Sequence, residues 1–200
     1  MTDNAWVFPV GHYLGTFFPA AGAPLQAHRV RVGRSVTSLY SDQEFAVWAL
    51  AHGLAGPADE RPWTCQRLAA AAREQSGADV TRIVAELLEE RVLVEAAPEL
   101  LFARTHRFQA LLSGLGTDPR RPDSFQLGLA GQPLAAVDEL AFEIWQWAPR
   151  QPTIWATCEL LATADGVAVG RPADPDAMLA PVLDRLHTLL SAGAGYLDVA

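Results

Sequence analysis

The sequence predicts an α+β protein, mainly helical, in which two similar units follow one another along the chain. Half of the 200 residues are hydrophobic, which is enough to bury one large core or two compact ones. In each half, segments that alternate apolar and polar residues precede segments with helical periodicity. A short phrase also recurs, as WTCQRLA at 63–69 and as WATCELLA at 155–162. Together these observations indicate a duplicated unit.

The first unit is predicted to open with extended segments. Residues 6–24 are aromatic and interrupted by Gly and Pro, a composition typical of short strands and turns. These aromatic side chains either cover the first core or, where exposed, form a patch that binds a partner. Residues 28–40 alternate about Gly33, which predicts a β-hairpin.

Three helices and a short strand are expected to complete this unit. Ser41 is placed to cap the first helix, with Glu44 completing a capping box, and Gly53 can end it. Thr64 is the expected N-cap of the second helix, over CQRLAAAAREQ. Apolar residues at helical spacing predict the third helix from about 78 to 91, and VLVEA then predicts a strand.

The following segment is predicted to join the two units. Residues 105–112 are expected to form a short helix, and LGTDPRRPD has the Gly, Pro and charge content of a linker. We therefore expect an aromatic N-terminal extension at 1–27, a first domain at 28–112, a linker at 113–124 and a second domain at 125–200.

Landmarks of the first unit then recur in the same order. An alternating segment surrounds Gly131 as one surrounds Gly33, and GYLDV closes the series as VLVEA does. The other pairs, with their offsets, are Phe45 and Trp48 with Phe142 and Trp145 (97), Thr64 and Cys65 with Thr157 and Cys158 (93), and Val80, Ile83 and Leu87 with Leu183, Leu186 and Leu190 (103). A conserved order at nearly constant offset indicates an internal duplication. Both cysteines are then expected in the core, each on the first turn of a helix.

No signature of catalysis stands out. The sequence holds no Gly-rich nucleotide loop, zinc-protease motif or nucleophile elbow, and its five histidines are scattered. We therefore expect a protein without catalysis, cofactor or metal. An enzyme that uses His12 or His187 is the alternative, and it requires these residues to meet in a cleft. The absence of a cationic N-terminal stretch and of a long apolar run predicts a cytoplasmic protein without a membrane segment.

The order hairpin, helix, helix, turn, helix, strand resembles a winged helix-turn-helix. It is also similar to the PqqD-like fold, a peptide-recognition winged helix found with enzymes that modify ribosomal peptides. The resemblance covers about 28–96 and again 125–199, and VRVGRSVTSLYSDQEFAVWALAHG, TCQRLA and VTRIVAELLEERVLV carry it. In that family the partner peptide adds a strand to the hairpin edge beside the third helix. The resemblance implies an edge at Val36, Ser38 and Tyr40 and a helix face at Arg82, Glu86 and Glu89.

Charge favours a protein or peptide partner over DNA. Residues 1–121 hold 12 Arg and 13 acidic residues, a net of −1, whereas residues 122–200 hold 3 and 10, a net of −7. In residues 79–91, where a recognition helix would lie, two Arg stand against four acidic residues. A DNA-binding regulator that uses the first unit is the alternative. Its candidate contacts are Arg61, Arg67, Arg73 and Arg82.

Overall fold

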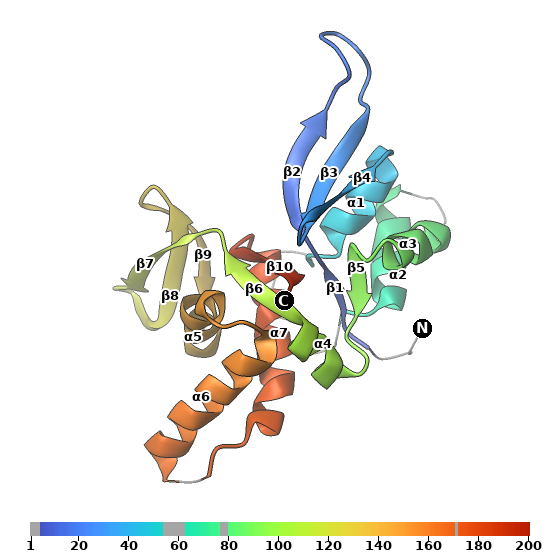
Figure 1. Ribbon diagram of the computed structural model, residues 1–200. Helices are drawn as coiled ribbons and strands as arrows, with labels where there is room; N and C mark the ends of the chain where they lie inside the picture. Colours follow the sequence, from blue (N-terminus) through green and yellow to red (C-terminus); the bar gives the residue numbers. More distant parts are fainter. Residues whose placement is uncertain (1–4, 54–62, 77–79, 171) are drawn as a thin grey trace. The chain divides into compact units, whose positions relative to one another are not determined.

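The structure is a computed structural model that describes residues 5–53, 63–76, 80–170 and 172–200 (Figure 1). These residues fall into two compact units. The first holds those up to Ala97 together with Leu197–Val199, and the second holds those from Pro98 to Tyr196 together with Ala200.

The first unit combines a three-stranded antiparallel sheet with three helices and a small second sheet. The order in the larger sheet is β2 (His12–Phe17), β3 (Ala27–Val32) and β4 (Ser35–Leu39), and β1 (Val7–Pro9) pairs with β5 (Leu93–Glu95). The helices are α1 (Asp42–Leu50), α2 (Cys65–Ser76) and α3 (Thr81–Glu89). The aromatic segment at 1–27 is therefore not an extension, because it supplies β1 and β2 and buries Phe8 completely.

The second unit contains the same series of elements behind one additional helix, α4 (Glu99–Thr105). The strands are β6 (His106–Ala110), β7 (Ser113–Asp118), β8 (Arg121–Leu129), β9 (Gln132–Val137) and β10 (Gly195–Val199). The helices are α5 (Glu139–Trp147), a short 3₁₀ turn (Ala148–Arg150), α6 (Ile154–Val169) and α7 (Pro175–Ser191). β7, β8 and β9 form the three-stranded sheet, and β6 pairs with β10.

The expectation of a mainly helical protein is wrong. Helix accounts for 44% and strand for 30% of the described chain, with the strands in four small sheets. The error arose mostly in residues 105–124. The predicted helix there is strand β6, in which His106 and Phe108 point inward with period two.

The predicted linker at 113–124 is also wrong, since it forms β7 and the start of β8. Its Gly, Pro and charged residues belong to a hairpin turn, where the Asp118 side chain accepts a hydrogen bond from the backbone N–H of Arg120. The unit boundary lies instead between Ala97 and Pro98.

The same backbone hydrogen bonds occur at equivalent positions within each of the two units. At the end of α3 the Val92 N–H donates to the Leu87 carbonyl, and at the end of α7 the Ala194 N–H donates to the Leu189 carbonyl. The Val92 carbonyl then accepts from the Val10 N–H, just after β1, and the Ala194 carbonyl accepts from the Leu111 N–H, just after β6, at 2.8 Å in both units. These repeated bonds support the internal duplication, and they set the offset of the last helix at 102, where the sequence comparison expected 103.

The repeated cysteines lie at different places in their helices. Thr64 caps α2 as predicted, accepting a hydrogen bond from the Arg67 N–H, so that Cys65 is the first residue of the helix. In the second unit Thr153 is the cap, and α6 therefore begins one turn before Cys158. Both cysteines are buried and neither forms a disulfide.

Candidate strand-binding site

Three of the four outer strands in the two larger sheets are irregular. β2, β7 and β9 each contain an additional residue relative to their neighbour, Leu14, Leu115 and Leu134 respectively. β9 also contains Pro133, which has no N–H to donate. Bulges and edge prolines are devices that prevent another strand from pairing with a sheet. Only β4 pairs in regular register along its whole length.

The hairpin turn decides which backbone groups of β4 face outward. Val32 and Ser35 flank a two-residue turn in which Gly33 has a φ of 57°, so they form a hydrogen-bonded pair. Because hydrogen-bonded pairs alternate, the N–H and C=O groups of Val36 and Ser38 point away from β3. In the part of the chain that the structure describes, no strand pairs with β4 on this side.

Side chains at this edge are accessible. Val36 and Tyr40 are 52% and 73% exposed, although both carry large apolar groups, while Leu39, on the opposite face of the strand, is fully buried. The Tyr40 N–H also points outward, but it donates to the Glu44 carboxylate at 2.7 Å. The edge thus has outward-facing N–H and C=O groups at Val36 and Ser38, and it ends where Glu44 occupies the next outward N–H. Sequence reasoning assigned Glu44 only to the helix cap.

The predicted face of α3 is acidic and near one end of this edge. Arg82 pairs with Glu86 at 2.8 Å, one turn along the helix, and Glu89 is exposed. Just beyond the helix, the pKa of Glu90 is raised by burial and by the nearby charges of Glu44 and Glu86. Since Glu44 also holds the Tyr40 N–H, the end of β4 and the end of α3 lie close together.

The arginines proposed to contact DNA are largely engaged elsewhere. Arg67 lies over the Trp63 ring, 5.4 Å from its centre, and Arg82 is paired with Glu86 as described. Arg73 lines a pocket between α2 and α3, and Arg61 lies outside the described residues. Of the three described arginines, Arg67 and Arg82 therefore already have a partner within the first unit.

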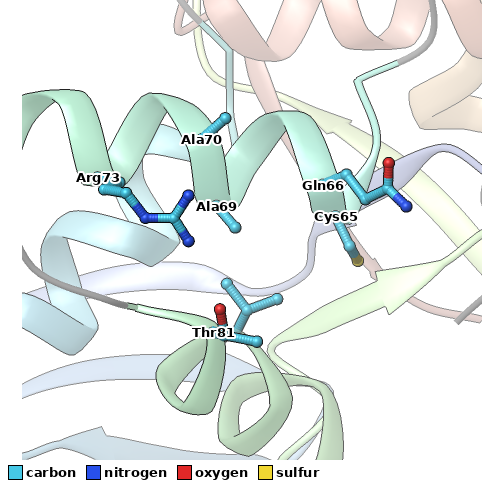
Figure 2. Close-up of a pocket in the computed structure, with 7 residues that line it drawn as sticks. Cys65, Gln66, Ala69, Ala70, Arg73 and Thr81 are labelled. Carbon is cyan, nitrogen blue, oxygen red and sulfur yellow. The ribbon is translucent and has the colours of Figure 1, made fainter.

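That pocket has a volume of about 260 Å³ (Figure 2). Arg73 runs back along α2 toward Ala69, above Thr81 of α3, and Cys65 lies at the far end. Burial and the neighbouring carboxylate of Glu95 raise the pKa of the Cys65 thiol to about 12. The thiol is therefore protonated at neutral pH and is a poor nucleophile.

The two histidines of the catalytic alternative belong to different units. His12 lies in β2 of the first unit and His187 in α7 of the second. Among the described residues, no three His, Cys, Asp or Glu side chains are grouped as metal ligands. None of the described helices is long and apolar enough to cross a membrane.

The chain matches no protein family, no curated protein and no solved structure. The similarity of each unit to the PqqD-like fold therefore stays a prediction from sequence.

Proposed function

We propose that this chain binds a partner protein or peptide without catalysis, and that the first unit takes an extended segment of the partner as an added strand on β4. The observation that supports this most directly is the contrast among the outer strands. β2, β7 and β9 carry features that prevent pairing, whereas β4 is regular and has outward hydrogen-bonding groups at Val36 and Ser38. The resemblance to the PqqD-like fold favours the same edge.

The arginines of β3 favour acidic residues in a partner strand beside Val36 and Ser38, whereas the carboxylate of Glu44 disfavours them beside Tyr40. Arg31 pairs with Val36 and Arg29 with Ser38, so both arginines lie on the same face of the sheet as these edge residues. Arg29 leans toward β2, with its guanidinium 4.1 Å from the centre of the Phe17 ring. An added strand would place alternate side chains on this face, where Asp and Glu are attracted.

The test is a selection of random extended peptides on the full chain, followed by titration calorimetry of the selected binders. Ser38→Pro removes the outward N–H without removing a bond to β3, and is expected to weaken binding at least about tenfold. Ala136→Pro, at the equivalent position of β9, is the matched control and should leave affinity unchanged. Circular dichroism establishes that both variants fold.

Two outcomes would contradict the proposal. One is a set of binders whose affinity does not change in Ser38→Pro. The other is a selection that yields no binder, combined with tight, salt-sensitive binding of random duplex DNA that is lost when Arg67 and Arg73 are replaced. That second result would favour the DNA-binding alternative.

A further inference from the structure

We propose that the pocket between α2 and α3 of the first unit binds a small monocarboxylate. Arg73 and Thr81 hold its carboxylate group at the rim, and Cys65 and Val84 contact its apolar tail on the floor; all four residues line the pocket. None of the described lining residues belongs to β4, so this inference goes beyond the proposed function and does not depend on it.

The pocket combines an accessible polar part with a buried apolar part. Figure 2 shows the Thr81 hydroxyl directed from α3 toward α2, and the Arg73 guanidinium on the side of α2 that faces Thr81. Both residues are exposed, whereas Cys65 and Val84 are buried. Ligand pockets typically join an apolar lining to a few polar groups that fix the orientation of the ligand. A molecule with one polar end and one apolar tail fits this arrangement.

Charge at the rim favours an anion. Of the described residues that line the pocket, Arg73 alone is charged. A guanidinium can donate two parallel hydrogen bonds to a carboxylate, which makes this group its best-matched small anion. Thr81 is the first residue of α3, and the first turn of this helix contains no acidic residue. The partial positive charge of the helix N-terminus therefore adds to the attraction of Arg73.

The far end of the pocket disfavours a second negative charge. Burial, followed by the charge of Glu95, raises the pKa of the Cys65 thiol, so the Glu95 carboxylate lies beside this end. In the described part of the chain, the Glu95 Oε1 atom is buried without a hydrogen-bond partner. A dicarboxylate that extends from Arg73 to Cys65 would place its second charge near this carboxylate, which is unfavourable. Inorganic phosphate has the charge but no tail to cover the floor.

The dimensions of the pocket limit the ligand to a short chain. Its volume of about 260 Å³ lies just below the range of roughly 300–1,000 Å³ that suits drug-sized molecules. Arg73 reaches back along α2 toward Ala69, which lies one helical turn from Cys65. One turn rises about 5–6 Å, so this is the distance from the carboxylate to the end of the tail. Pentanoate has this length.

An NMR titration of the full, isotope-labelled chain with pentanoate tests the site. The amide signals of Ala69, Thr81 and Val84 should shift and saturate, with a dissociation constant between about 0.1 and 10 mM, as expected for a ligand of few atoms. Three probes of related chemistry serve as comparisons. Pentanol lacks the charge, glutarate carries a second carboxylate and inorganic phosphate lacks the tail, so each should bind at least about fivefold more weakly.

Variants separate binding in the pocket from general attraction of anions. Arg73→Gln should weaken pentanoate binding at least about tenfold, because it removes the charged donor. Arg34→Gln removes one positive charge from the exposed turn between β3 and β4, and as the matched control it should leave the affinity unchanged. Thr81→Val keeps the shape of the side chain without its hydroxyl and should weaken binding less than Arg73→Gln. Circular dichroism establishes that the variants fold.

Two results would overturn the inference. One is that pentanoate at about 50 mM leaves the signals of the pocket residues unchanged. The other is that Arg73→Gln and Arg34→Gln bind pentanoate equally well. Peptide binding at Val36 and Ser38 is measured separately, so either result would leave the proposed function intact, and a failure of peptide binding would leave this site intact.

Discussion

One difference between the cores of the two units gives a quantitative test of the duplication. In the first unit His28 stacks on Phe45, with ring centres 4.2 Å apart. In the second, Phe125 stacks on Phe142 at 4.4 Å, and each residue pairs with a threonine of the neighbouring strand. We expect that His28→Phe therefore fits the first unit.

The expected cost of His28→Phe follows from its contacts. The histidine loses hydrogen bonds to Asp42 at 3.0 Å and to the Tyr13 hydroxyl at 3.1 Å, each worth about 0.5–1.5 kcal/mol. Asp42 stays hydrated, and Tyr13 keeps its bond to Thr16. The larger apolar ring contributes about 1–2 kcal/mol in return. The net change in the free energy of unfolding should be within about 1 kcal/mol.

His28→Ala removes the stacked ring and should cost about 2–4 kcal/mol. Phe125→His is the reciprocal change, and it should cost about 1–3 kcal/mol because Gly114 stands where the first unit has Tyr13. Urea unfolding of the full chain, monitored by tryptophan fluorescence, measures the change in the free energy of unfolding for all three variants. If His28→Phe costs as much as His28→Ala, the two positions are not equivalent and the reasoning fails.

Three further predictions concern single residues. Burial raises the pKa of both Cys65 and Cys158 to about 12, so at pH 8 only about 1 in 10⁴ of each thiol is ionised, and a thiol reagent should label them only after denaturation. Burial lowers the pKa of His52, so this histidine binds a proton more readily in the unfolded chain than in the folded one. The melting temperature should therefore fall as the pH decreases below about 6.5. In His52→Gln this decrease in melting temperature should be smaller. Gly128→Ala would place a Cβ 1.9 Å from the Gln132 carbonyl oxygen and should lower the free energy of unfolding by more than about 3 kcal/mol. Gly116→Ala has open space around the new Cβ, and only the strain of its φ of 88° should lower the free energy of unfolding, by about 1–2 kcal/mol. Thermal unfolding of both variants measures the two values, and equal values would contradict the clash at Gly128.

Much of the first unit could be predicted from sequence because its signals are local. The alternation about Gly33 gave the β3–β4 hairpin, and the spacing of Ser41 and Glu44 gave the start of α1, where Ser41 accepts from the Glu44 N–H. Thr64 was likewise identified as a cap. Each of these depends on residues within a few positions of one another.

The region around the unit boundary could not be predicted for the opposite reason. β6 pairs with β10, about 85 residues further along the chain, and no local pattern records that pairing. Because the sequence alone does not reveal the partner strand of residues 106–110, it predicts a helix there. The turn at Asp118 then resembled a linker, since turns and linkers share Gly, Pro and charge.

The sequence predicted the β4 edge of the candidate site, but it did not predict that the other outer strands are irregular. Val36, Ser38 and Tyr40 followed from the resemblance, and all three belong to the outward series of β4 or its continuation. The bulges that make β4 different from β2, β7 and β9 are backbone features of one additional residue, which alternation alone does not reveal.

The central claim is that β4 accepts an added strand, and residue-resolved amide hydrogen exchange tests it most directly. In dilute protein the N–H groups of Val36 and Ser38 should exchange rapidly, because neither donates to β3. Saturation with a selected peptide should slow both by at least about tenfold and leave Ala136 on β9 unchanged. Binding that leaves Val36 and Ser38 in fast exchange would contradict the account.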